Sequence, residues 1–419
     1  MPQKRLIWFC HGMERAADQP DLLPRLRDEI GLTTIMPESP ICHTSGFRAS
    51  DELTRRDPFA DWRTRGDAYP RIAEGIYPPV AGIVGGFDDA PLLRLLESAQ
   101  KAGIEVWGHI GLWSYGGDVY PEYAMRDIED QPLDMRYRQW GIGLCPSRKE
   151  INDWTSDCLV YAAKRYDLDG YCVDHARYPA PANLHALFAC GCAHCQRAAT
   201  ALGYDFSRLR EGVLRFRASL ARLDRHQLTR LLANAPNLWD FALCDGGPEF
   251  LQWLQMRAAL LGGHDYATWR KGADYLTGGS SFGGVVGWAT MVTDLAGEWA
   301  PALCRLVPGL AESEALELVW RLFGYDDLDL PATTAALQPD QLPLTTIFAR
   351  EVAKLKTAAD PALGLYPPIS AGAAPHIVKA FCTALAENRC DGAILSFGAT
   401  EDAVEKVLRM RIGKWLEGR

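Results

Sequence analysis

The chain has 419 residues, 48% hydrophobic, 10% aromatic and 23% charged, which provides enough apolar material for a large buried core and excludes a disordered or collagen-like chain. Lysine and arginine total 44 against 53 aspartate and glutamate, so the net charge of −9 disfavours nucleic acid and anionic membranes as partners. The chain has no run of 18 apolar residues and no signal-peptide pattern at its N-terminus, so we expect a cytoplasmic protein.

Short strand-like runs alternate with helix-like stretches, which is typical of an α/β protein with a parallel sheet. The clear runs lie at 5–11, 32–38, 104–113, 169–179, 284–291, 362–369 and 391–398, and a weaker one lies at 303–310. Helical patterns lie at about 88–102, 148–165, 375–389 and 401–416. Eight strand-helix units favour a (β/α)₈ TIM barrel, and an open doubly wound sheet is the main alternative.

Three long segments interrupt this alternation, at about 39–80, 113–147 and 180–283, and the last is mostly helical in pattern. None carries a strand set of its own, so we expect one barrel domain, residues 1–419, enlarged by loop insertions. The active sites of barrels are built on the loops that follow the strands, so the insertions are expected to border the site.

The segment YDLDGYCVDHARYP, residues 166–179, contains the strongest candidate for a catalytic residue. Strand alternation places Asp174 on the face with the small residues, at the carboxyl end of the predicted strand, where a carboxylate suits catalysis better than core packing. Arg177 is near enough in sequence to hold that carboxylate ionised or to bind a substrate hydroxyl, and a purely structural ion pair is the alternative. His175 is a further candidate substrate contact.

The same segment carries a signature of the form DG-x₃-D-x₂-RYP. Its residues are Asp169, Gly170, Asp174, Arg177, Tyr178 and Pro179. With this signature, and with LCPSRKEINDW at 144–154 before it, the chain resembles glycoside-hydrolase-like TIM barrels over roughly 80–200 and 360–415. In related alpha-amylase-like barrels this aspartate is the catalytic nucleophile, so the resemblance implies a glycosidase with Asp174 as nucleophile or base.

Cys190, Cys192 and Cys195 form a C-x-C-x₂-C motif, and Cys145 lies 45 residues before the first of them. Four thiolates make a closed tetrahedral zinc site of the structural type. The set is similar to the zinc cluster of family 42 beta-galactosidases, which implies a structural Zn²⁺, although the Asn-Glu pair of that family is missing here. His194 is an alternative fourth ligand, and reduced metal-free thiols or an iron-sulfur cluster are alternatives to zinc.

Glycoside hydrolysis normally requires a second carboxylate. Asp294 has the best position for it, because it directly follows a predicted strand. Further candidates at strand ends or in loops are Glu38, Asp118, Glu122, Asp245 and Glu249. Any of these acids is alternatively a solvated surface group.

Trp107, His109 and Trp113 recur at even spacing along the run 104–113, with Tyr115 beyond it. Aromatic side chains beside hydrogen-bonding groups are typical of a sugar subsite, so His109, Trp113 and Tyr115 are candidate substrate contacts. A buried His109 with its hydrogen bonds satisfied inside the protein is the alternative. Weaker candidates for the same cleft are His11, Glu38 and His43.

We therefore expect a glycosidase that acts on an oligosaccharide or glycoside, with Asp174 and Asp294 as its carboxylates. One alternative is a catalytically silent carbohydrate-binding barrel. Another is a lyase or isomerase with a catalytic metal held by His11, Glu38, His109 and Asp174. Relatives with this type of barrel often self-associate, so a homo-oligomer is also expected.

Overall fold

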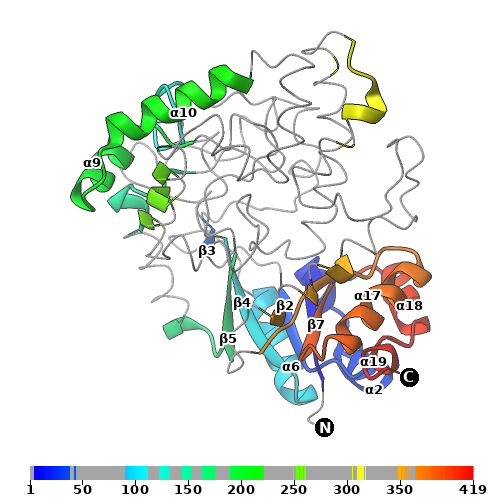
Figure 1. Ribbon diagram of the computed structural model, residues 1–419. Helices are drawn as coiled ribbons and strands as arrows, with labels where there is room; N and C mark the ends of the chain where they lie inside the picture. The colour runs from blue at the N-terminus through cyan, green and yellow to red at the C-terminus, as the bar shows by residue number, and fades with distance from the viewer. Residues whose placement is uncertain are drawn as a thin grey trace. The chain divides into compact units, whose positions relative to one another are not determined.

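The computed structural model describes residues 4–37, 42–43, 90–111, 122–132, 144–152, 163–174, 189–220, 249, 252–253, 255–257, 259–260, 304, 309–315, 317, 348–350, 352–353, 356–357 and 364–418 (Figure 1). The chain divides into two compact units. The first unit comprises Met1–Ala124, Trp140–Arg177 and Ala359–Arg419, and the second comprises Met125–Gln139 and Tyr178–Ala358. The single barrel domain with its three insertions stays a prediction.

The first unit contains a parallel β-sheet. Its strands are β1 (Arg5–His11), β2 (Thr34–Pro37), β3 (Cys42–His43), β4 (Glu105–Gly111), β5 (Gly170–Asp174), β6 (Pro368–Ser370) and β7 (Gly392–Gly398). The strand order is β3-β4-β2-β1-β7-β6, and β5 pairs with β4. The predicted α/β class with a parallel sheet is confirmed. The strand expected at 284–291 lies outside the described residues.

β1 lies between the second strand of the chain and the last. Its residues Ile7 to Cys10 are in parallel register with Thr34 to Pro37 of β2. On its other side, the whole strand from Arg5 to His11 is in register with Gly392 to Gly398 of β7. β1 is therefore a central strand, which explains why its sequence RLIWFCH is an almost continuous apolar run.

One face of the β1–β7 pair is completely apolar, and we call it the apolar face. It carries Leu6, Trp8, Cys10, Ala393, Leu395 and Phe397, all of them buried. The Trp8 and Phe397 rings stack with centroids 4.7 Å apart. The indole N–H of Trp8 also donates to the Phe397 carbonyl oxygen at 3.0 Å, so the one polar atom of that side chain is satisfied.

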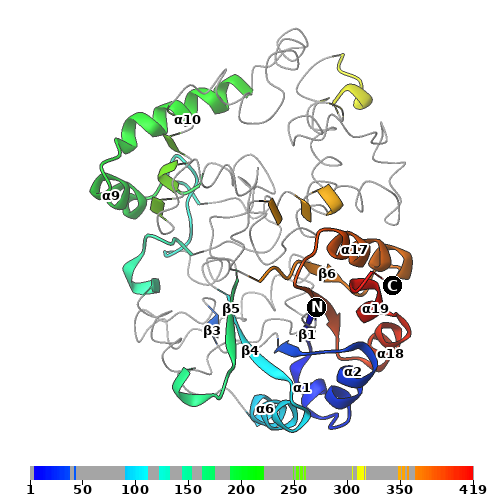
Figure 2. The ribbon, with the colours of Figure 1, turned by 60° about the horizontal axis from the view of Figure 1, so that its bottom comes forward.

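Helices of the first unit pack beside this sheet, as Figure 2 shows. They are α1 (Met13–Ala17), α2 (Leu22–Ile30), α6 (Ala90–Ala102), α17 (Pro375–Glu387), α18 (Glu401–Arg409) and α19 (Ile412–Leu416). α6 contacts β4, and α17 and α18 contact β7. The helices predicted at 88–102 and 375–389 are confirmed by α6 and α17.

The helical pattern over 401–416 is confirmed, and two helices share it, α18 and α19. The Thr400 hydroxyl caps the start of α18 by accepting from the Ala403 N–H, and Met410 ends the helix with an extended ψ of 141°. α19 then begins at Ile412 and approaches the end of α2 closely. A Cβ atom on Gly413 would lie 2.9 Å from the Ile30 carbonyl oxygen, so this contact requires glycine.

Two of the predicted strands need correction. The run 362–369 yields only β6, Pro368–Ser370, because the Leu365 N–H binds the Asp391 carboxylate at 2.9 Å instead of a neighbouring strand. Within the weaker run 303–310, Cys304 is helical and Gly309 has a left-handed φ of 80° in a turn. A left-handed φ is incompatible with a β-strand, so the described residues of this run do not form the expected strand.

The second unit is helical in its longest described segment. α9 (Ala193–Ala201) and α10 (Phe206–Leu220) follow one another, which confirms the helical pattern expected there. The Phe206 ring packs against the fully buried Trp253 ring with centroids 5.4 Å apart. This contact gives the second unit an aromatic core of its own.

Candidate functional site

Polar residues lie at the carboxyl ends of the strands, in contrast to the apolar face. Because every strand pairing in the sheet is parallel, these ends lie at the same edge. His11 ends β1 in register with Gly398 at the end of β7. Asp174 ends β5 in register with Gly111 at the end of β4. This edge is where ligands bind in parallel α/β proteins.

His11 is joined to Ser396 across β1 and β7. Its Nε2 atom lies 2.8 Å from the Ser396 hydroxyl oxygen, within hydrogen-bonding distance. Ser396 is in register with Phe9, and the Phe9 ring meets the His11 ring edge-on with centroids 4.7 Å apart. The imidazole of His11 is therefore oriented by a hydroxyl and an aromatic edge.

His109 lies on β4, and its side chain is only 4% exposed. Its ring centroid is 5.1 Å from that of Phe9 on β1, in an edge-on arrangement. His11, Phe9 and His109 consequently form one continuous group of rings on the same side of the sheet. The structure thus brings together two of the predicted substrate contacts, and the burial of His109 agrees with the alternative that it is a core histidine.

Trp107, near the amino end of the same strand, contacts neighbouring side chains through both its N–H and its ring. Its indole N–H donates to the Glu105 carboxylate at 3.2 Å, and the Arg5 guanidinium lies over its ring at 5.3 Å from the centroid. Arg5 and Glu105 also form an ion pair with each other. Trp107 therefore packs within a structural group at the end of the strand opposite to His11.

β5 places Asp174 in the sheet and Asp169 just before it. A Cβ atom on Gly170 would lie 3.0 Å from the Trp107 indole, so this face is crowded and a small residue suits it. The Asp169 carboxylate accepts a hydrogen bond from the Val106 N–H at 2.8 Å and fixes the amino end of the strand. One aspartate of the signature therefore has a structural role, while the other ends the strand at the carboxyl edge.

Several predicted site residues lie outside the described part of the chain. They are Glu38, Trp113, Tyr115, His175, Arg177 and Asp294, together with the weaker candidates Asp118 and Asp245. Of the remaining acids, Glu122 is an exposed residue.

Glu249 does not suit the role of a general acid. Its side chain is 16% exposed and pairs with Arg208 at 3.2 Å and with Arg215 at 3.4 Å. A hydrogen bond from its own backbone and the Arg208 guanidinium hold the pKa of Glu249 below its ordinary value. A general acid needs a raised pKa, so Glu249 is a structural partner of α10.

Four cysteine thiols lie close together, as the spacing predicts. The Sγ atoms of Cys145, Cys190, Cys192 and Cys195 are all within 4.8 Å of one another, and all four residues are buried. None of them is in a disulfide. In a tetrahedron with metal–sulfur bonds of about 2.3 Å, the sulfur atoms are about 3.8 Å apart, so the group fits a metal ion.

Backbone N–H groups in the second unit point at two of these sulfur atoms. The Arg126 N–H donates to Cys190 Sγ at 3.2 Å, and the Cys195 N–H donates to Cys192 Sγ at 3.5 Å. Such N–H···S hydrogen bonds stabilise a negatively charged thiolate, the form that binds a metal. His194 is not a member of the group, and its Nδ1 atom lies 3.1 Å from the Arg197 guanidinium.

The loop that carries Cys190 is fitted tightly to residues 126–128. The Gly191 N–H donates to the Asp127 carbonyl oxygen at 3.0 Å, and a Cβ atom at Gly191 would lie 2.4 Å from that same oxygen. Arg210 of α10 donates to the Ile128 carbonyl oxygen of the same residues at 2.8 Å. The C-x-C-x₂-C motif therefore includes a glycine for a packing reason that its spacing alone does not show.

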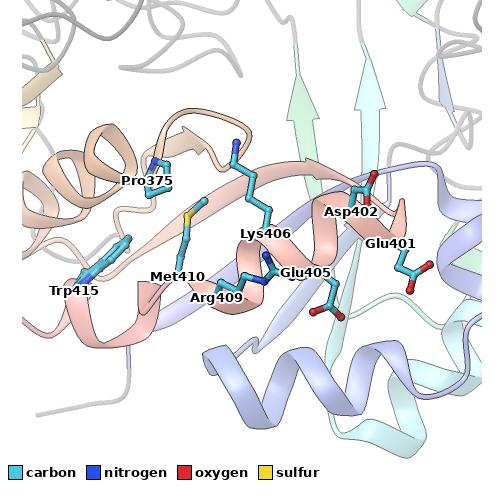
Figure 3. A pocket seen from close by; sticks show the side chains of 8 residues that line it. All are labelled: Pro375, Glu401, Asp402, Glu405, Lys406, Arg409, Met410 and Trp415. Atoms are coloured by element: carbon cyan, nitrogen blue, oxygen red, sulfur yellow. The ribbon is translucent and has the colours of Figure 1, made fainter.

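A hollow of about 620 Å³ in the first unit is lined by side chains of α17, α18 and α19 (Figure 3). Two of its charged side chains have partners. Glu405 pairs with Arg25 at 2.6 Å, and the Arg25 guanidinium lowers the pKa of Glu405. The Lys406 ammonium donates to the Gly372 carbonyl oxygen at 2.5 Å. This hollow is a charged groove on the helical layer.

No family model matches the chain, and no curated protein matches it. Among solved structures it is similar to alpha-L-fucosidase isoenzyme 2 from Paenibacillus thiaminolyticus, with a TM-score of 0.41 and 12% sequence identity. The match covers 98% of this chain, which spans about half of that protein, 49% of its length. A likeness this distant shows no shared activity. In the described part of the chain, no helix is both long and apolar enough to cross a membrane.

Proposed function

We propose that this protein is a glycoside hydrolase on a (β/α)₈ barrel, with Asp174 as nucleophile or base. The observation that carries the proposal is the place of Asp174, which ends β5 at the carboxyl edge of an all-parallel sheet. Active-site residues of (β/α)₈ barrels come from this edge. The DG-x₃-D-x₂-RYP signature around Asp174 supports the same assignment.

The strand order supports a barrel over an open sheet. β5, β4, β2, β1, β7 and β6 follow one another in an order that is sequential once the last strands are placed before the first. A doubly wound sheet instead reverses its order at a switch point beside an early strand. Pairing of the first strand with the last is what closure of a barrel requires.

The proposed chemistry uses two carboxylates. Asp174 attacks the anomeric carbon or activates a water, and Asp294 protonates the leaving oxygen. Arg177 keeps the Asp174 carboxylate ionised, since a nearby guanidinium favours the charged form. The remaining proposed substrate contacts are His11, Glu38, His109, Trp113, Tyr115 and His175.

We further propose that Zn²⁺ binds the thiolates of Cys145, Cys190, Cys192 and Cys195. Four thiolates fill the tetrahedral coordination of zinc and leave no position for water, so the metal would be structural. The buried thiols and the N–H groups directed at Cys190 and Cys192 support this donor set.

The test compares two aspartates that flank the same strand. Wild type, Asp174→Asn and Asp169→Asn are incubated with a panel of 4-nitrophenyl glycosides and oligosaccharides, and product release is followed. We expect Asp174→Asn to lower kcat/KM by at least about a hundredfold for any substrate that wild type hydrolyses. Asp169→Asn keeps an oxygen that accepts from the Val106 N–H, so it should stay within about twofold of wild type.

The outcomes separate the proposal from its alternatives. Equal losses of kcat/KM in both aspartate variants would mean that the activity depends on an intact β5 and not on the carboxylate of Asp174. Hydrolysis that survives in Asp174→Asn would remove that residue from the mechanism. Binding of sugars without any hydrolysis by wild type would favour a carbohydrate-binding barrel.

A further inference from the structure

We infer that the hollow lined by α17, α18 and α19 binds an oligosaccharide, with the Trp415 ring as the surface on which a sugar ring stacks. The inference rests on the proposed function for the class of its ligand, and it adds a second sugar site to that function. The hollow measures about 620 Å³. This volume lies within the range of about 300–1,000 Å³ that is typical of small-molecule sites.

Part of the lining lies at the carboxyl edge of the sheet. Glu401 comes three residues after β7 ends at Gly398, and Pro375 comes five residues after β6 ends at Ser370. Segments that directly follow parallel strands lie at the carboxyl edge of those strands. The hollow therefore has one part of its lining at the edge where the catalytic site is proposed.

Trp415 is the aromatic side chain of the lining, and the packing of its helix relies on other residues. α19 buries Ile412 and Leu416 and contacts α17, whereas Trp415 is only half-buried. An indole ring presents a flat apolar face and one N–H donor. A sugar ring has an apolar C–H face and hydroxyl groups around its rim, so it can cover the indole and still use its hydrogen bonds.

The charged side chains of the lining favour a neutral ligand over an ion. Glu405 is held by an ion pair, and Lys406 donates to a backbone carbonyl oxygen. The other three are exposed and carry both signs, since Glu401 and Asp402 are acidic and Arg409 is basic. A singly charged ligand would meet its own sign as well as the opposite one. Sugar hydroxyls both donate and accept, so they match carboxylates and a guanidinium alike.

The lining is longer than a single sugar ring. Figure 3 shows Trp415 and Met410 at one end of the hollow and Glu401 and Asp402 at the other, with Arg409 between them. Glu401 and Arg409 are eight residues apart on α18, which corresponds to about 12 Å along the helix axis. One sugar on Trp415 would not reach the two carboxylates, so the expected ligand is a chain of several sugars.

A structural role for the charged residues is the competing explanation. Acidic side chains in the first turn of a helix and basic ones in its last turn stabilise the helix dipole. Glu401, Asp402 and Arg409 have these positions in α18. That explanation does not extend to Trp415, which is uncharged and belongs to another helix. Variants of Trp415 are therefore the decisive ones.

The chain offers a matched control for each variant. Trp415→Ala removes the ring, and Trp415→Tyr keeps an aromatic surface. Tyr366→Ala removes a half-buried aromatic ring of the same unit that does not line the hollow. Arg409→Ala removes a cation of the lining, and Arg411→Ala removes an exposed cation just beyond α18 that is outside the lining.

The experiment locates sugar binding on the full chain independently of hydrolysis. Every variant also carries Asp174→Asn, and the probes are cellotetraose, xylotetraose, mannotetraose and maltotetraose. Hydrogen-exchange mass spectrometry follows the amide hydrogens of α18 and α19 during a titration with each probe, and thermal unfolding reports stability. We expect a recognised tetraose to slow this exchange, and Trp415→Ala to raise the Kd of that protection at least about tenfold.

The other variants should fall between that loss and no change. Trp415→Tyr should keep the Kd within about threefold, because an aromatic face remains. Arg409→Ala should raise the Kd about threefold to tenfold, since a hydrogen bond from a charged group is lost. Arg411→Ala and Tyr366→Ala should stay within about twofold, because neither side chain lines the hollow.

Three results would overturn the inference. The first is exchange in α18 and α19 that none of the tetraoses slows, and the second is protection that is equal with and without Trp415→Ala. The third is an equal loss of protection in Trp415→Ala and Tyr366→Ala that follows their loss of thermal stability. Protection that depends on Trp415, in a protein that hydrolyses no glycoside with Asp174 intact, would contradict only the proposed glycosidase. Hydrolysis that depends on Asp174, without this protection, would contradict only the second sugar site.

Discussion

β7 in the first unit and residues 189–195 in the second unit are both largely buried, but their buried atoms differ. β7 buries the side chains of Ala393, Leu395 and Phe397. The cysteine segment buries sulfur atoms, and the N–H groups of Arg126 and Cys195 donate to Cys190 and Cys192. Apolar surface is stabilised by leaving water, whereas grouped thiolates repel one another unless a cation lies among them. The sheet is stabilised by its own apolar side chains, whereas the cysteine segment contributes to a group of thiols that fits a metal ion.

Loss of the metal should have the largest effect, because thiolate–zinc binding contributes roughly 10–16 kcal/mol in small zinc domains. We expect purified wild type to contain about one zinc per chain and Cys192→Ser to lose nearly all of it. Amide hydrogens of α9, which begins next to this cysteine, should then exchange faster. Elemental analysis and hydrogen-exchange mass spectrometry measure the two effects.

Cys382 provides the control for that experiment. It is the single cysteine of α17, and burial raises the pKa of its thiol to about 12, so it stays protonated and does not bind metal at neutral pH. Cys382→Ala should therefore keep the full metal content. A Cys192→Ser protein that retains its zinc would show that the four cysteines are not the zinc ligands. Iron in the purified protein would favour an iron-sulfur cluster.

The apolar face should give the next largest effect. Leu395 is fully buried in β7, so Leu395→Ala removes apolar contacts and leaves a cavity, at a cost of about 2–5 kcal/mol in the free energy of unfolding. Leu93 on α6 is 36% exposed, and Leu93→Ala should cost clearly less. Urea denaturation compares the two variants. Zinc content should stay unchanged in both, and equal losses of stability would contradict the burial argument.

The features that depend on residues close together in the sequence were predicted best. The runs 5–11, 104–113 and 391–398 are largely apolar, and they contain β1 (5–11), β4 (105–111) and β7 (392–398). The cysteine group could also be predicted, because the spacing of its cysteines in the sequence is typical of metal ligands. The sequence did not indicate the break between α18 and α19, where Met410 adopts an extended ψ of 141°.

The site was predicted only in part, for the same physical reason. His11 could be proposed from its place at the end of a strand. Its partner Ser396 lies 385 residues away in sequence, and only the pairing of β1 with β7 brings the two together. Glu249 looked like a candidate acid until Arg208 and Arg215 of α10 were found beside it. Contacts between distant segments decide which polar residues are structural, and periodicity does not report them.

The smallest effect on stability should come from the exposed charges of the helices, in contrast to the buried side chains of the apolar face. Arg25 of α2 and Glu405 of α18 form an ion pair at 2.6 Å with side chains 44% and 34% exposed. Arg25 lowers the pKa of Glu405, so any stabilisation is present above the ordinary pKa of 4.5 and is lost as the pH falls through the lowered value. Water and salt screen such a pair, so Glu405→Gln should shift the midpoint of thermal unfolding by no more than about 1 °C at pH 7. The shift should vanish in 0.5 M salt, where the pair is screened, and at a pH below the lowered pKa of Glu405, where the carboxylate is protonated. A shift as large as that of Leu395→Ala would mean that the helices depend on this ion pair as much as the strands depend on apolar burial.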